Sequence, residues 1–309
     1  MPSTVSQLTS APSTLRWVAA GLLFALLWAS AATATKIGLT SVQPLVLAEL
    51  RFFLAATLML TVAHGLSRRP LPTATQWRPL AIYGFLNISL YLGLYVVAMQ
   101  HVTAGIGSLA IATNPIFISL LSSFLFKKKL TGQIIASLII CSTGVVCAAW
   151  PLLHSASVTS MGLVLLLGSM LCYSAATLYY ASRSLKDLPL FVVNGWQTLF
   201  GGLFLLPAAL IFYQPQRNHF SVNSWAAVGW LAVPVSVVAI QLWLWLLRTD
   251  AVKAGLWLFC CPVFGLAIAA WLIGDAIGIY TVVGVALVIS GLGLAQKRKP
   301  QNQINMLSK

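Results

Sequence analysis

Residues 101–148 read HVTAGIGSLAIATNPIFISLLSSFLFKKKLTGQIIASLIICSTGVVCA, two apolar helical stretches joined by three lysines. The pattern returns without a gap at residues 248–295, which read RTDAVKAGLWLFCCPVFGLAIAAWLIGDAIGIYTVVGVALVISGLGLA. Pro115 aligns with Pro262 and Gly144 aligns with Gly291. A proline, a short turn and a small-residue face therefore coincide in the two stretches, which predicts an internal repeat.

The two copies differ in where their basic residues lie. Residues 127–129 are three lysines, whereas the matching residues 274–276 carry no basic residue. The preceding turn is reversed, since residues 101–105 have no Lys or Arg and residues 248–253 have two. Lys and Arg collect on the cytoplasmic loops of membrane proteins. The exchanged charges therefore predict two copies inserted in opposite orientations, an arrangement typical of transporters.

The composition is that of an integral membrane protein. Of 309 residues, 59% are hydrophobic and 7% are charged, whereas soluble domains average roughly 25% charged residues. The net charge of +14 comes from basic residues in short turns between long apolar runs. This placement indicates orientation in a lipid bilayer and argues against a nucleic-acid partner. The five cysteines lie inside apolar segments without metal-ligand spacing, so we expect neither disulfides nor a metal site.

We expect an all-α integral membrane fold, with ten transmembrane helices arranged as two inverted five-helix repeats. About 20 residues suffice to cross a bilayer, and the apolar runs fall at residues 17–36, 44–64, 79–99, 104–126, 132–150, 161–181, 189–212, 225–247, 253–273 and 279–296. The expected divisions are a disordered cytoplasmic tail (1–14), a first repeat (15–150), an inter-repeat loop (151–160), a second repeat (161–296) and a basic cytoplasmic tail (297–309).

The distribution of basic residues also predicts the orientation of the chain. In this ten-span topology 15 of the 18 Lys and Arg residues fall on the side that holds both termini. Only Lys36 and Arg217 fall on the other side, and Arg51 lies within a span. Because cytoplasmic loops carry the excess of Lys and Arg, both termini are predicted to be cytoplasmic.

Short motifs occur in order along residues 17–296: Leu-Trp at 27–28, Leu-Arg-Phe-Phe-Leu-Ala at 50–55, Asn-Pro-Ile-Phe at 114–117, Cys-Pro-Val-Phe at 261–264 and Gly-Asp at 274–275. Together they resemble the drug/metabolite transporter superfamily, specifically its EamA-type permeases with two copies and ten helices. The resemblance implies carrier-mediated movement of small organic metabolites, often export of amino acids or related compounds. The sequence departs from the family pattern at Lys128, where an acidic residue is common, and at Ser137, where glycine is usual.

Pro115 and Pro262 are predicted to lie near the middle of spans 104–126 and 253–273. A proline inside a helix removes one backbone hydrogen bond and kinks the helix, and freed carbonyls are tolerated in a membrane only beside protein or a water-filled cavity. We interpret the matched prolines as hinges that flank a central cavity, around which the two halves rock. The alternative is a pair of static kinks.

Glu49 is the one carboxylate that falls well inside a predicted span. Ionisable groups are costly in a membrane and usually face a cavity or a partner. One interpretation is a structural ion pair of Glu49 with Lys36 or Arg51. The other is a carboxylate that couples transport to protons or binds a substrate amine. Arg51 lies on a different face of the helix and is a candidate to bind an anionic group of the substrate or backbone carbonyls.

Two pairs of residues suggest a substrate pocket. Asn87 and Tyr91 are four residues apart and share a helix face, as do Gln241 and Trp245. Their spans correspond in the repeat, so the two pairs are predicted to line opposite walls of one pocket. Such a pocket, rich in aromatic rings and amides, suits a zwitterionic or weakly polar organic molecule. Further candidates for substrate binding are Asn114 and Trp28, although deep tryptophans such as Trp28 and Trp245 can also serve as anchors.

Other functions are less well supported by the sequence. The chain has no phosphate-binding glycine loop, no metal-spaced His/Cys cluster and no catalytic triad, so we expect no catalytic residues, cofactor or ATP hydrolysis. The alternative is an integral-membrane enzyme that acts on a lipid or isoprenoid, which would need acids or histidines clustered at one membrane face. Small residues at 137, 141, 144 and 148 indicate close helix packing, within the chain or across a homodimer. The predicted function is an alternating-access transporter, secondary-active or facilitative, of the bacterial inner membrane.

Overall fold

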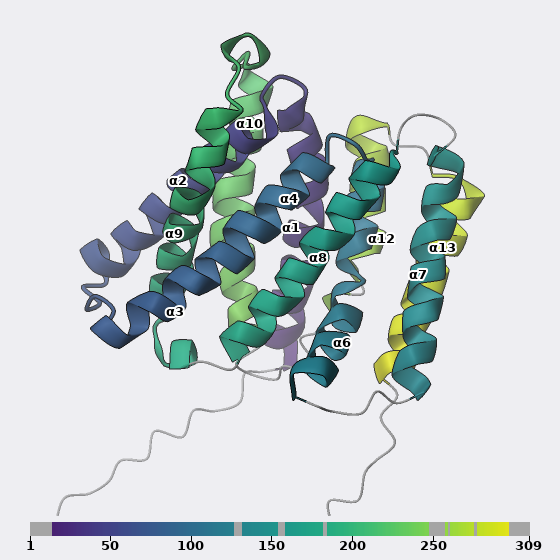
Figure 1. The fold of residues 1–309 in the computed structure, drawn as a ribbon, viewed down its shortest axis with the longest axis horizontal. Helices are drawn as coiled ribbons and strands as arrows, with labels where there is room; N and C mark the ends of the chain where they lie inside the picture. Colours follow the sequence, from purple (N-terminus) through teal and green to yellow (C-terminus); the bar gives the residue numbers. More distant parts are fainter. Residues whose placement is uncertain are drawn as a thin grey trace, which may run out of the picture.

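The computed structural model describes residues 14–126, 132–153, 158–181, 184–246, 257–258, 260–274 and 277–296 (Figure 1). All regular elements within these ranges are helices, and none is a strand, which confirms the helical fold class. Both tails and the lysines at 127–129 lie outside the described residues, as do the charged turn at 248–253 and Asp275.

Within these described ranges, six helices are long and apolar enough to cross a membrane, namely Leu15–Leu39, Pro44–Leu66, Ala74–Ala98, Ser160–Tyr180, Leu190–Ile211 and Val222–Leu246. Four shorter apolar helices accompany them: Ala104–Ile118, Ile135–Ala148, Cys260–Ile273 and Ile279–Gly291. The protein is therefore a multi-pass membrane protein.

The first half of the chain contains α1 (Thr14–Leu39), α2 (Pro44–Leu60) with η1 (Thr61–Leu66), α3 (Ala74–Gly84) with η2 (Phe85–Leu90) and α4 (Tyr91–Ala98), α5 (Ala104–Ile111), α6 (Asn114–Phe126) and α7 (Gly132–Leu153). The second half contains α8 (Ser160–Ala181), η3 (Ser184–Asp187), α9 (Leu190–Ile211), η4 (Pro215–Arg217), α10 (Val222–Trp230) with η5 (Leu231–Ala239), α12 (Cys260–Ile273) and α13 (Ile279–Gln296).

Local sequence explains where several helices begin. Pro44 opens α2, at a position where the missing N–H would be unpaired in any helix. Before α3, the backbone N–H of Thr73 donates to the Gln76 side chain at 2.9 Å, as part of a capping box. Ser221 caps α10 in the same way. These caps satisfy backbone donors at the helix starts that have no partner within the helix.

The third helix of each half contains a π-helical segment. The segment η2 continues α3, and η5 continues α10 and runs into helical residues 240–246. Pro234 lies inside η5 and supplies no backbone donor there. Segments of π-helix are frequent at functional sites, and both of these lie in helices that line the central cavity described below.

Several helix connections meet at one end of the bundle, the upper end in Figure 1. Lys36 Nζ donates to the Met99 carbonyl at 2.8 Å, and the Thr159 N–H donates to the His101 carbonyl at 3.0 Å. The backbone N–H of Gln43 donates to the Asn218 side chain at 2.9 Å. The helix α1 therefore ends where α8 begins.

Equivalent helices of the two halves make the contacts between the halves. The helix α2 packs along α9, and α7 packs along α13. The first helix of each half contacts the other half, because α1 packs against α12 and α10, and α8 packs against α6 and α4. This exchange-symmetric pattern fits a two-repeat layout.

The small-residue face of α7 packs on α13 within the chain. A Cβ atom on Gly144 would lie 2.7 Å from the Gly284 carbonyl oxygen, and one on Gly291 would lie 2.6 Å from the Cys141 sulfur. Gln133, at the start of α7, donates to the Leu294 carbonyl at the end of α13, so the two helices are antiparallel. The end of α13 therefore lies at the same end of the bundle as the start of α1.

Candidate functional site

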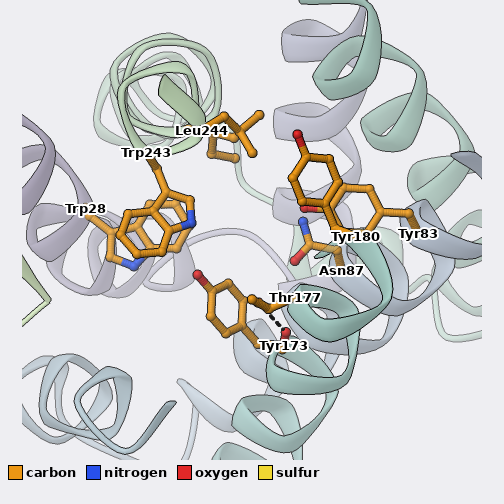
Figure 2. Close-up of a pocket in the computed structure, with 9 residues that line it drawn as sticks. Trp28, Tyr83, Asn87, Tyr173, Thr177, Tyr180, Trp243 and Leu244 are labelled. Atoms are coloured by element: carbon orange, nitrogen blue, oxygen red, sulfur yellow. Dashed lines mark hydrogen bonds between the residues drawn. The ribbon is translucent and has the colours of Figure 1, made fainter. Parts of the chain in front are cut away.

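A small cavity lies between the two halves (Figure 2). It is lined by Trp28 of α1, Tyr83 of α3, Asn87 of η2, Tyr173, Thr177 and Tyr180 of α8, and Ile240, Trp243 and Leu244 of the helix that follows η5. Its volume is about 30 Å³, enough for only a few water molecules. Pockets that hold small organic ligands measure about 300–1,000 Å³, so a solute can enter only if the walls separate.

Aromatic rings form most of the cavity wall. Trp243 stacks on Phe24 with ring centroids 4.9 Å apart, and Phe24 stacks on Trp28 at 6.0 Å. On the opposite wall Tyr83 stacks on Tyr180 at 5.2 Å. Figure 2 shows the two tryptophans facing these tyrosines across the cavity. Both walls can therefore contact a planar or apolar solute, and such aromatic contacts would stabilise its binding.

A buried hydrogen-bond network positions Asn87. Its side-chain amide donates to Gln197 at 3.0 Å, and the amide of Gln197 donates to Asn194 at 2.9 Å. Asn194 in turn donates to the Ser236 carbonyl at 2.9 Å, while Arg51 Nε donates to the Ser236 hydroxyl at 2.8 Å. All five residues are buried. The network joins four helices, and in Figure 2 the Asn87 oxygen faces the cavity. A fully bonded buried network of this kind holds its members in one arrangement.

The predicted pocket residues do not all come together. Trp28 and Asn87 line the cavity, and Tyr91 packs behind its wall on Tyr173, with centroids 4.9 Å apart. Gln241 and Trp245 instead line a separate groove on the other side of their helix. The pairs Asn87/Tyr91 and Gln241/Trp245 are 154 residues apart, whereas the repeat is offset by 147 residues at positions 101 and 248. Equal spacing within two corresponding spans therefore does not make the residues equivalent or place them in one pocket.

Glu49 is buried, with 7% of its surface exposed, and neither carboxylate oxygen has a hydrogen-bond partner among the residues that the structure describes. Its Oε2 lies 3.4 Å from the position of a Cβ on Gly202, at the α2–α9 contact. Lys36 donates to the Met99 carbonyl, and Arg51 bonds to Ser236 and lies 5.7 Å from the centre of the Phe52 ring. A buried carboxylate without a hydrogen bond is costly, so Glu49 is a candidate to bind a proton or a cationic group.

The prolines begin helices rather than interrupt them. Pro115 is the second residue of α6, after a break in the helix at residues 112–113, and Pro262 is the third residue of α12. A proline in the first turn removes no intrahelical bond. For Pro115 the predicted position in the middle of a continuous helix is therefore corrected, because the span divides at residues 112–113 and the proline starts its second part. Most of the stretch before Pro262 lies outside the described residues.

The broken segments of the two halves lie close together. Ser108 of α5 is fully buried and donates to the Cys261 carbonyl at 3.1 Å, beside Pro262. Asn114, 1% exposed, opens α6 with its side-chain oxygen unbonded, and its backbone carbonyl accepts a hydrogen bond from Ser174. Asn114 therefore lies at the break and does not line the cavity.

Several cavity residues were not selected from the sequence. They are Tyr83, Tyr173, Thr177, Tyr180, Ile240, Trp243 and Leu244. The useful signal was present in the spacing, since Tyr83 lies four residues before Asn87 and Tyr173 four residues before Thr177, on shared helix faces. Across the described part of the chain, His, Cys, Asp and Glu form no group of three or more that could hold a metal ion.

Comparison with known proteins identifies the family. The model of the EamA-like transporter family matches residues 15–150 and again residues 160–295. An "uncharacterized inner membrane transporter" of Escherichia coli K12, YedA, is 30% identical over 74% of each chain. An "uncharacterized transporter" of Archaeoglobus fulgidus is 24% identical over 89% of this chain and 96% of its own length.

The fold is also represented among solved structures. One crystal structure superposes with a TM-score of 0.64 at 20% identity, covering 92% of this chain and 98% of the other. At this identity the likeness concerns the fold alone. The family and the names of the relatives indicate a membrane transporter.

Proposed function

Because the chain belongs to the EamA-like transporter family, we propose that it carries small organic metabolites, such as amino acids or related amphiphilic compounds, across the bacterial inner membrane. It does so as a secondary-active or facilitative carrier, in the direction of export. The observation that carries the proposal is the small cavity, whose walls come from both halves of the chain and combine aromatic rings with one fixed amide.

The proposed topology has ten crossings in two mutually inverted five-helix repeats, with both termini in the cytoplasm. The repeats are residues 15–150 and 161–296, with residues 151–160 between them. The meeting of the connections at one end supports inversion, since equivalent helices α1 and α8 then run in opposite directions. The bias of Lys and Arg toward the other end supports cytoplasmic termini.

Alternating access in this proposal is a movement of the two halves about the cavity. Pro115 and Pro262 are the proposed hinges, because each lies in the first turn of a helix and the break at residues 112–113 leaves the span of Pro115 in two parts that can tilt separately. The contact between Ser108 and the Cys261 carbonyl joins these breaks across the halves. Rocking about such a contact would widen the cavity toward one face while it closes the other.

The direct test is flux in proteoliposomes that contain the full-length chain. A panel of radiolabelled amino acids and amines is measured for counterflow, in which excess unlabelled solute inside drives labelled solute inward. We expect saturable counterflow for a subset of the panel and none in empty liposomes. Equal, unsaturable entry of all solutes into both kinds of vesicle would contradict the proposal.

A second prediction concerns proton coupling at Glu49. Glu49→Gln keeps the size of the side chain but removes its titratable group. We expect this variant to lose stimulation of flux by a pH gradient while downhill counterflow persists. Asp187→Asn is the matched control, because Asp187 is exposed in η3. Gradient-driven flux that is unchanged in Glu49→Gln would remove Glu49 from the coupling mechanism.

A further inference from the structure

Two grooves flank the α2–α9 pair, one toward each end of the bundle. The lower groove has a volume of about 620 Å³ and lies between the end of α2, the start of α9 and helical residues 237–245. The upper groove, of about 330 Å³, lies between the start of α2, the end of α4 and the end of α9. Each is large enough for a small organic molecule, whereas the central cavity has a volume of only about 30 Å³.

The grooves are equivalent under the internal repeat. Upper-groove residues in the first half of the chain correspond to lower-groove residues 145 positions later in the second half. Lower-groove residues that follow η1 likewise correspond to upper-groove residues 145 positions later, at and after the end of α9. The matched pairs are Pro44 with Pro189, Val97 with Leu242, Ser67 with Phe212, and Arg69 with Gln214. Equivalent surfaces at opposite ends are what a carrier with two access states requires, one for each side of the membrane.

Each groove combines apolar walls with one exposed arginine at its edge. Arg69 borders the lower groove and Arg217 borders the upper groove. Arginine binds carboxylates through two parallel N–H groups. One arginine at each groove provides one such site, which suits a solute with a single carboxylate.

The floor of the lower groove favours a polar solute over a lipid chain. Gln241 borders this groove, and both its side-chain oxygen and nitrogen are buried without a hydrogen-bond partner. A buried amide that stays unbonded is energetically costly, and an acyl chain cannot satisfy it. A solute with polar atoms beside its apolar body can.

One helix separates the lower groove from the central cavity. Ile240, Trp243 and Leu244 line the cavity, whereas Gln241 and Trp245 line the groove. This wall directly follows η5, where Pro234 and π-helical turns replace regular α-helical bonding. Movement of this single segment would open the groove to the cavity.

We infer that the two grooves are the entry and exit sites of the carrier, and that Arg69 and Arg217 bind the carboxylate of a monocarboxylate solute with an apolar body, one at each face of the membrane. The inference rests on the proposed transport function and adds the substrate class and the two residues that select it.

The experiment measures flux of L-phenylalanine separately from each face of oriented proteoliposomes. Arg69→Gln is expected to raise the apparent KM about tenfold or more at the face that holds the termini, because a charge-assisted hydrogen bond is lost. Arg217→Gln should act in the same way at the opposite face only. Arg69→Lys and Arg217→Lys, which keep the charge, should retain most of the affinity. Phenylacetate should compete with the flux, and phenethylamine, which lacks the carboxylate, should not.

The matched control is Arg68→Gln, which removes the same charge one residue away from the groove and should leave KM unchanged. Equal effects of Arg68→Gln and Arg69→Gln, effects at both faces, or competition by phenethylamine would each overturn the inference. An Arg69→Gln effect that disappears in bilayers without anionic lipid would also overturn it, because a lipid headgroup would then be the ligand. Saturable flux that is unaffected by either arginine would leave the transporter proposal intact and remove only this inference; absence of any flux would remove both.

Discussion

Thr177→Trp is expected to lower transport at least about 100-fold while the protein remains folded. Thr177 lines the central cavity from α8, between the tyrosine wall and the tryptophan wall. The cavity holds about 30 Å³, so an indole ring would occupy all of the space through which a solute must pass. Overpacking costs typically about 1–3 kcal/mol, and a separation of the two halves can relieve this cost. The indole ring would still fill the path of the solute through the cavity.

The control for this substitution lies on the same helix. Leu171 of α8 is 42% exposed, so Leu171→Trp adds the same ring to the face away from the cavity and should transport normally. Thr177→Ser, which keeps a hydroxyl and removes a methyl group, should also retain most activity. The measurement is counterflow per folded molecule, with folding judged by the elution profile in detergent. Normal counterflow in Thr177→Trp would place the solute path elsewhere.

Gly201→Leu is expected to prevent the two halves from packing. A Cβ atom on Gly201 would lie 2.2 Å from the Cβ of Ile88 and 2.7 Å from the Gly84 carbonyl oxygen. Gly84 is also in close contact with α9, since a Cβ atom added to it would lie 2.4 Å from the Gln197 carbonyl oxygen. Two backbones meet here without intervening side chains, as small residues allow in membrane proteins. A branched side chain must push α9 away from α3, which also breaks the network that holds Asn87.

The expected readout is a loss of most folded protein, seen as aggregation in detergent and a lower unfolding temperature of the remainder. Gly229→Leu is the control, because no atom lies within 4 Å of a Cβ built at Gly229. It places leucine at another helical glycine and should leave folding unchanged. If Gly201→Leu matched Gly229→Leu in yield and unfolding temperature, the close contact of α3 and α9 would be wrong.

The general architecture was predictable because its signals are large. Long apolar runs can only be membrane helices in a chain with so few charges, and the match of Gly144 to Gly291 anticipated a close contact. That contact is the α7–α13 pair, in which each glycine faces the other helix. Whether it lay within one chain was not predictable, since a small-residue face is equally compatible with a second copy.

The composition of the cavity was only partly predictable because it depends on helix rotation. Asn87 and Trp28 were selected as deep polar or aromatic residues, and both line the cavity. Gln241 was assigned to the same pocket because its span corresponds to that of Asn87 in the repeat. Gln241 and Trp245 do share a helix face, but that face lines a separate groove, and correspondence of two spans does not specify which face of each is turned to the cavity.

The structural environments of the two prolines and of Glu49 were also not predictable from the sequence. Both prolines were recognised as breaks in apolar runs, but a sequence does not show whether a proline bends a helix or begins one. The Ala112–Thr113 break resolves this for Pro115. For Glu49, an ion pair with Lys36 or Arg51 was plausible from proximity in the sequence. In three dimensions the Arg51 guanidinium bonds to Ser236, and both Glu49 oxygens stay unbonded, because each partner is determined by helices distant in the chain.

The most direct test is the accessibility of Thr177→Cys to a membrane-impermeant thiol reagent, applied from each face in turn and compared with the wild-type chain, which has five free cysteines of its own. A cavity that opens alternately between two inverted halves predicts additional labelling from both faces, slowed by a transported solute. Labelling from one face only, unaffected by the solute, would contradict it.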